Sequence, residues 1–213
     1  MTNKSVVFAL PCNHGYAKGF LGKFIQAYNH AIVNGWQVAV LEGDAVPHDF
    51  NRNELTRTFL NHTTAEWLLF IDDDVFPPAN IVDMLQDDVD IVGCDVRNFM
   101  ESKPVSTAVV LKECGTKAER KNLTERQEVL GVGTGCMGVN RRVVEKLENN
   151  WFRFEYDETG YRTTGEDYFF CQRVREAGFK IIYDPAFVCG HMKQVYIKGD
   201  NVVSSLLKGM NKV

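Results

Sequence analysis

The sequence of 213 residues lacks several patterns that would assign it to a class at once. No apolar run reaches the roughly 18 residues of a membrane-spanning helix, and the amino terminus has no signal-peptide pattern. Neither G-x-G-x-x-G nor a P-loop occurs, so both common nucleotide-binding fingerprints are absent. The net charge of -4 gives no electrostatic reason to expect nucleic acid or an anionic membrane as a partner.

Paired cysteines are also missing. The six cysteines are Cys12, Cys94, Cys114, Cys136, Cys171 and Cys189. No C-x-x-C pair occurs, and in a chain of this size the spacing indicates free, mostly buried thiols in a reducing compartment. A zinc site would need clustered ligands, which the sequence does not show. We therefore expect no zinc site and a cytoplasmic location.

What the chain does contain is a regular alternation of strands and helices. Strands are expected at Val6–Leu10, Trp36–Leu41, Leu68–Ile71 and Ile91–Cys94, and helices at Phe20–Ala31, Arg52–His62 and Pro78–Gln86. This order predicts a parallel sheet covered by helices on both faces. No linker or internal repeat divides the chain, so we expect a single α/β domain.

The second half is less regular. Strands are expected at Val105–Leu111, Cys136–Val139, Phe179–Tyr183 and Phe187–His191, and helices at Arg141–Leu147, Glu166–Ala177 and Val202–Met210. Glu113–Glu128 is highly charged and Asp157–Thr164 is polar with a glycine. The first segment is expected to be exposed or mobile, and the second is expected to be a loop.

An acidic stretch follows the third expected strand. Leu68–Ile71 runs directly into Asp72, Asp73 and Asp74, and open α/β sheets bind ligands at the carboxyl ends of their strands. Three adjacent carboxylates repel one another unless a cation compensates them. Asp72 and Asp74 could converge on one metal ion while Asp73 points the other way. An acidic turn that caps a helix starting at Pro78 is the alternative.

A second pair of acids precedes the helix expected at Glu166–Ala177. Asp167 has the three- and four-residue spacing of the apolar stripe through Phe170, so it should point inward, where a carboxylate can act as a general base. The alternative is a capping box, in which Thr164 is the cap and Asp167 the third helical residue. The local sequence alone favours the cap.

Three further features depend on what surrounds them. His191, taken alone, is most simply structural, but two carboxylates and an imidazole on one ion would suit Mn²⁺ or Mg²⁺ that also holds phosphate oxygens. Arg52 begins a helix and is either an anion-binding residue or an exposed arginine. Gly131–Gly138, with four glycines, permits close approach of a ligand or forms a tight turn.

The order of these features is informative. An early strand ending in Pro11 is followed by Arg52-Asn53, LLFIDDDVFPP, DIVGCDVR, GTGCMGVNRRVVEKL and GEDYFFCQRVREAGFKIIYDPAFVCGH. In this order, and over most of the chain, the segments resemble GT-A-fold, family-2-like glycosyltransferases that use nucleotide sugars. The resemblance implies a GT-A-like single domain, a Rossmann-like αβα sandwich with a mostly parallel central sheet and a smaller acceptor-side region. Residues 1–98 would bind the nucleotide sugar and residues 99–213 the acceptor.

The resemblance also implies roles for individual residues. Asp72 and Asp74 match the D-x-D motif that ties a divalent cation to the donor diphosphate, with Asp74 as the direct ligand and Asp72 nearer the ribose or a metal-bound water. His191 matches the histidine that completes the metal site. Asp167 matches the base that activates the acceptor, with Glu166 as its substitute. The expected donor contacts are Pro11, Glu42, Asp44, Arg52, Asp73 and Gly135.

The implied activity is transfer of a sugar from a UDP-sugar to a hydroxyl of a glycan or glycoprotein, dependent on Mn²⁺ or Mg²⁺. A divalent cation stabilises the charge that develops on the leaving phosphate. Three alternatives stay open: a haloacid-dehalogenase-type phosphatase, a sugar nucleotidyltransferase and an inactive nucleotide-sugar-binding module. The first places D-x-D on its first strand, and the second needs a glycine-rich basic loop that Pro11–Lys18 matches poorly.

The resemblance bears on source and context as well. Small members of this kind occur in phages and large DNA viruses, and for such a source the expected location is the host cytoplasm. The donor sugar, the acceptor, the stereochemical outcome, the oligomeric state and membership in a longer polypeptide are left open by the sequence.

Overall fold

The computed structural model describes residues 4–12, 15–44, 46–100, 103–111, 118–193, 196–198 and 201–203. Its centre is a seven-stranded sheet of order β10-β14-β5-β11-β3-β1-β2. The strands are β1 (Ser5–Pro11), β2 (Gln37–Gly43), β3 (Trp67–Ile71), β5 (Ile91–Asp95), β10 (Gln127–Glu128), β11 (Cys136–Asn140) and β14 (Ile181–Val188). Only β11 and β10 run against the others in this sheet. The predicted, mostly parallel α/β sheet is confirmed.

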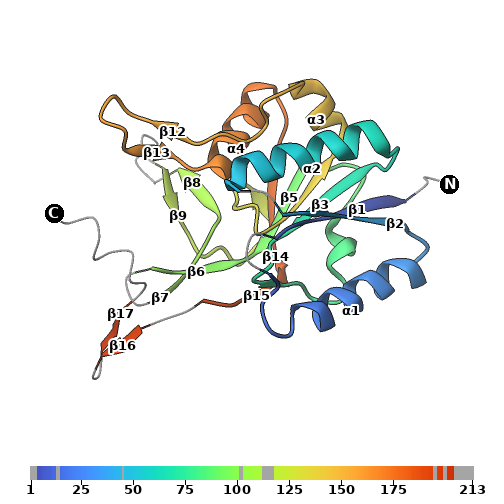
Figure 1. The fold of residues 1–213 in the computed structure, drawn as a ribbon, viewed down its shortest axis with the longest axis horizontal. Coiled ribbons are helices and arrows are strands. Elements are labelled where there is room, and N and C mark those ends of the chain that lie inside the picture. Colours follow the sequence, from blue (N-terminus) through green and yellow to red (C-terminus); the bar gives the residue numbers. More distant parts are fainter. Residues whose placement is uncertain are drawn as a thin grey trace.

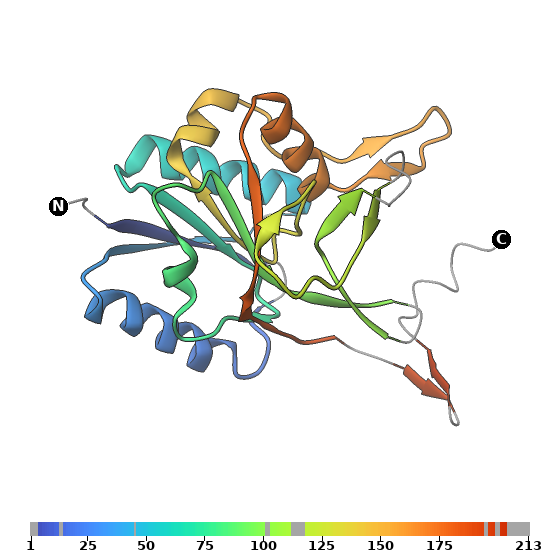
Figure 2. The same cartoon turned by 180° about the vertical axis from the view of Figure 1, so that it is seen from behind.

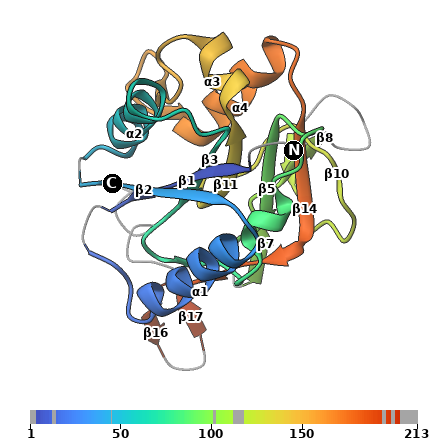
Figure 3. The same ribbon diagram turned by 90° about the vertical axis from the view of Figure 1, so that its right-hand side faces the viewer.

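Helices cover both faces of the sheet, as Figures 1 and 3 show. On one face lie α2 (His48–His62), α3 (Arg141–Leu147) and α4 (Glu166–Glu176), and on the other lie α1 (Phe20–Val33) and the 3-10 helix η1 (Ile81–Met84). Alternate residues of a strand point to opposite faces. Phe8 of β1 accordingly packs in the core with Phe24 of α1, whereas Val7 packs in the core with Phe59 of α2.

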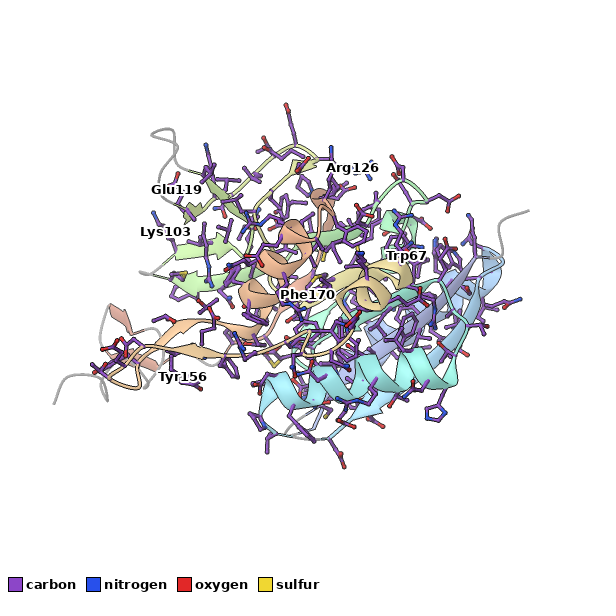
Figure 4. All side chains as sticks on the ribbon, turned by 90° about the horizontal axis from the view of Figure 1, so that it is seen from above. Trp67, Lys103, Glu119, Arg126, Tyr156 and Phe170 are labelled. Carbon is purple, nitrogen blue, oxygen red and sulfur yellow. The ribbon has the colours of Figure 1, made fainter. Side chains whose placement is uncertain are left out.

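Short hairpins form a smaller region at one side of the sheet, away from the amino terminus (Figure 2). They are β6 (Arg97–Met100) with β7 (Lys103–Ser106), β8 (Val109–Leu111) with β9 (Ala118–Arg120), β12 (Glu155–Tyr156) with β13 (Arg162–Thr164), and β16 (Tyr196–Lys198) with β17 (Asn201–Val203). Tyr156, Lys103 and Glu119 lie on these hairpins at the periphery, and Trp67 and Phe170 lie within the body (Figure 4). None of the described helices is long and apolar enough to cross a membrane.

The expected helix at Pro78–Gln86 is wrong, because only the single 3-10 turn η1 forms there. The apolar residues Ile81, Val82, Met84 and Leu85 are all buried. Their spacing is also that of an amphipathic α-helix, so the apolar pattern does not distinguish a helix from a tight turn. A tight turn instead places all four of them in the core.

Three expected boundaries in the second half are also wrong. The strand at Val105–Leu111 divides into β7 and β8, because the Ala108 amide donates to the Ser106 hydroxyl at 3.2 Å and turns the chain. The two strands expected at Phe179–Tyr183 and Phe187–His191 are largely one strand, β14, with a register shift between Asp184 and Val188.

The segments expected to be exposed and irregular contain strands. Asp157–Thr164 contributes β13 to a hairpin, and Glu113–Glu128 contributes β9 and β10, although its residues 113–117 lie outside the described part. The tail helix expected at Val202–Met210 does not begin as predicted, because residues 201–203 form β17. Residues 204–210 lie outside the described part.

Gly93 in β5 gives a test of how tightly the sheet is covered. An added Cβ there would lie 2.7 Å from the Cβ of Val132, which is a fixed atom rather than the end of a flexible side chain. We expect Gly93→Ala to reduce the free energy of unfolding by about 1–3 kcal/mol in urea denaturation. Gly22→Ala in α1, where nothing lies within 4 Å, is the matched control. It should raise the same quantity by about 0.5–1 kcal/mol.

Candidate active site

The site lies at the topological switch point of the sheet, where successive connections between strands change from one face of the sheet to the other. Strand β1 has β2 on one side and β3 on the other, so the connections that follow it pass over opposite faces of the sheet. In open α/β sheets this position leaves a crevice at the carboxyl ends of the strands. A cavity of about 360 Å³ opens here, lined by Pro11, His48, Arg52, Asp72, Asp73, Asp74, Glu166 and Lys193.

Asp74 is surrounded by basic groups. Its Oδ1 lies 3.3 Å from Nε2 of His191, and its Oδ2 lies 2.8 Å from Nζ of Lys193. Burial raises the pKa of Asp74, but the hydrogen bonds from His191 and Lys193 outweigh this effect and lower the pKa to about 2. Asp74 is therefore ionised at neutral pH.

A short strand pairing brings these residues together. β4 (Val75–Phe76) pairs with β15 (Gly190–His191), with His191 opposite Val75, and the Met192 amide donates to the Asp74 carbonyl at 2.9 Å. Nδ1 of His191 lies 2.9 Å from the Arg97 carbonyl. A partner at Nδ1 fixes the ring and leaves Nε2 to face Asp74.

Asp72 is oriented differently. Its amide donates to the Gly135 carbonyl at 3.0 Å, and its Oδ1 accepts from Nη2 of Arg52 at 2.9 Å. Arg52 is only 3% exposed, and its Nε lies 3.7 Å from Oε1 of Glu166. Within the described residues, Nη1 of Arg52 makes no hydrogen bond. Because Arg52 lines the cavity, this buried donor can serve a bound anion.

The residues present fit a divalent cation at Asp74 and His191. Ligand atoms 3.3 Å apart can occupy neighbouring positions on an octahedral ion with bonds of about 2.0–2.1 Å. The ammonium of Lys193 shows that this carboxylate already accommodates a positive charge. Asp72, Asp74 and His191 are not a closed set, since within the described part of the chain they do not all lie within 4.8 Å of one another.

Two carboxylates stand at the start of α4 in different environments. Glu166 lines the cavity and faces Arg52, whereas Asp167 lies outside the cavity lining and accepts from the Tyr168 amide at 2.8 Å. Burial, with a further contribution from the charge of Glu166, raises the pKa of Asp167 to about 6. An added Cβ at Gly165 would lie 2.8 Å from Oδ1 of Asp167, so a larger residue there would displace this carboxylate.

The other expected donor contacts divide into two groups. Pro11 and Asp73 line the cavity. Glu42 accepts a hydrogen bond from the Tyr16 hydroxyl, and Asp44 is exposed; neither lines the cavity. Gly135 packs against Asp72, since a Cβ there would lie 3.6 Å from Oδ2 of that residue.

Two cavity residues were not predicted from the sequence. Lys193 follows His191 by two residues, a spacing that places both side chains on one side of an extended segment. His48 precedes Arg52 by four residues, a spacing that places both on one face of a helix. Neither spacing identifies a site residue by itself. Each becomes informative only when His191 or Arg52 is already known to belong to the site.

Comparison with known proteins assigns the family. Residues 16–200 match the family described as glycosyltransferase like family 2, and the chain belongs to this family. Among solved structures, A197 from STIV matches with a TM-score of 0.57 and 15% identity, covering 94% of this chain and 93% of that one. No curated protein matches the sequence.

Two larger enzymes share the fold. A mutant of Drosophila β1,4-galactosyltransferase 7, in complex with manganese, UDP-Gal and xylobiose, matches with a TM-score of 0.56 and 13% identity over 90% of this chain and 71% of that one. GalNAc-T7 with UDP, GalNAc and Mn²⁺ matches with a TM-score of 0.55 and 12% identity over 93% of this chain and 44% of that one. At these identities the likeness establishes the GT-A-like fold.

Replacing Arg52 tests whether its charge holds the site together. Arg52→Ala leaves Asp72 and Glu166 without their cation. We expect the free energy of unfolding to fall by about 2–3 kcal/mol, less than for a fully buried pair because Asp72 is 27% exposed. Arg57→Ala, which removes an exposed partner of Glu54 on the same helix, should cost less than about 1 kcal/mol. Equal costs in urea denaturation would contradict a special role for Arg52.

Proposed function

We propose that this protein is a glycosyltransferase that depends on a divalent cation and moves a sugar from a UDP-sugar to a hydroxyl of a glycan or glycoprotein. One observation carries the proposal. Asp74, whose carboxylate pairs with His191, and the buried Arg52 line one cavity at the point where α/β folds of this topology bind ligands. The solved structures of GalNAc-T7 and galactosyltransferase 7, which contain UDP species and manganese, support the choice of donor and metal.

On the donor side, Asp74 and His191 would hold Mn²⁺ or Mg²⁺, and Asp72 would face the ribose or a metal-bound water. Such an ion supplies Lewis-acid stabilisation of the charge that develops on the leaving diphosphate. The free donor of Arg52 and the ammonium of Lys193 both face the same cavity and would bind diphosphate oxygens. Pro11 would contact the nucleotide base.

On the acceptor side, we assign the general base to Asp167. A base works best when its pKa lies near the operating pH, and the pKa of Asp167 is raised to about 6. Glu166 is the substitute, since it lines the cavity, where it forms an ion pair with Arg52. Asp167 would take the acceptor's hydroxyl proton as that oxygen attacks the sugar.

Donor binding gives the first test. In calorimetric titrations, UDP and UDP-sugars should bind only when Mn²⁺ is present, because the diphosphate is held largely through the cation. Asp74→Ala should abolish this binding and His191→Ala should weaken it about tenfold or more. Asp88→Ala, which alters an exposed carboxylate, should bind as the unaltered protein does.

Two results would contradict the donor assignment. One is UDP binding that ignores the metal, and the other is no binding to any UDP species. Binding of a nucleoside triphosphate together with a sugar phosphate, in preference to UDP-sugars, would favour the nucleotidyltransferase alternative.

The pH profile tests the base. A base acts in its deprotonated form, so the kcat/KM of glycosyl transfer should rise with pH through about 6 and then level off. Asp167→Asn should lower kcat by about 10²–10⁴-fold and remove that inflection, while Mn²⁺-dependent UDP binding persists. If Glu166→Gln removes the inflection and Asp167→Asn does not, the base is Glu166. If the protein binds the donor, and replacing both Asp167 and Glu166 leaves the rate of glycosyl transfer unchanged, the protein is a binding module.

A further inference from the structure

Three cysteines that are far apart in the sequence meet in the core. The Sγ atoms of Cys94, Cys136 and Cys189 all lie within 4.8 Å of one another, and those of Cys94 and Cys189 are 3.3 Å apart. The expectation that the cysteines are unclustered is therefore wrong. Spacing along the chain could not show it, because each cysteine comes from a different part of the fold.

The sheet register explains the meeting. Met137 of β11 pairs with Gly93 of β5, which places Cys136 beside Cys94. The Cys189 amide donates to the Asp95 carbonyl at 3.0 Å, just after the register shift in β14. All three side chains then lie on the sheet face that α1 covers, with exposures of 1% for Cys94, 1% for Cys136 and 7% for Cys189.

We propose that Cys94, Cys136 and Cys189 form a binding site for a soft, thiophilic metal ion, with Cu⁺ as the preferred occupant. Thiolate sulfurs select soft ions over the hard Mn²⁺ and Mg²⁺ that carboxylates bind. Structural zinc takes four ligands, whereas three sulfurs form the whole set within the described residues. A soft ion that accepts three-fold coordination fits this set better than zinc.

The charge of the site fits an ion that displaces protons. Burial raises the pKa of Cys94, so this thiol is neutral without an ion. Each thiol that becomes a ligand gives its proton to solvent as the sulfur–metal bond forms, and no electron is transferred. An occupied cluster therefore holds the cation through thiolates rather than through neutral thiols.

An ion has a route to the cluster. Cys189 lines a second cavity of about 320 Å³, which Arg97, Phe99 and His191 also line. Cys189 precedes His191 by two residues, so a bound ion would fasten the segment that carries His191 to β5 and β11. The soft site shares no ligand with the carboxylate site, and the inference does not depend on the proposed function.

Anaerobic titration of the reduced, metal-free protein with Cu⁺, in competition with a chromogenic Cu⁺ chelator, tests the site. We expect one Cu⁺ per chain. Cys136→Ser should weaken the affinity by about 100-fold or more, because even indirect partners of a metal site contribute about 10–100-fold. Cys171→Ser is the matched control, since Cys171 is an equally buried cysteine outside the cluster, and it should bind Cu⁺ normally.

A parallel Mn²⁺ titration separates the two sites. Cys136→Ser should keep Mn²⁺ binding, and Asp74→Ala should keep Cu⁺ binding, so failure of one proposal leaves the other standing. X-ray absorption at the copper edge of the unaltered protein needs no variant, and it should show three sulfur ligands. Absence of Cu⁺ uptake, nitrogen or oxygen ligation, undiminished affinity in Cys136→Ser, or a Cys94–Cys189 disulfide that persists in the reduced protein would overturn the inference.

Discussion

The buried guanidinium of Arg52 has almost no access to water, and a charge in that position is tolerated only beside opposite charges. Asp72 supplies one such charge from the end of β3, and Glu166 supplies another from the start of α4. Because α2 carries the arginine, these contacts fix three elements relative to one another. The residues that line the cavity between these elements are therefore held in place before any ligand binds.

The second constraint is the antiparallel strand β11, which lies between β3 and β5. The Asp72 amide donates to the Gly135 carbonyl just before β11, so the acidic segment turns away from the sheet at a fixed point. Asp74 then lies beside the extended segment of β15, which returns from the far end of the chain with His191 and Lys193. The candidate site thus depends on contacts between segments far apart in the chain, such as Asp74 and Lys193, which are 119 residues apart.

Much of the fold could be predicted from local patterns. The strands β1, β2, β3 and β5 were expected within one or two residues, because short apolar runs with turn residues at their ends are strong signals. The helix expected at Pro78–Gln86 failed, since a buried 3-10 turn and a helix of the same length have similar apolar content. The hairpins of the second half were not predicted, because each of their strands is only two to four residues long. Such a strand is too short to show a periodic pattern in the sequence.

The sequence by itself determined the class of fold, the family and the identity of the acids at the ends of β3 and the start of α4. Such features are local: an apolar run, a turn, a carboxylate at a strand end. Only the tertiary structure decided that Arg52 is buried between Asp72 and Glu166, that Lys193 reaches Asp74, and that three scattered cysteines share one place in the core. Those contacts follow from strand order and register, which pair residues distant in the chain and which no local spacing encodes.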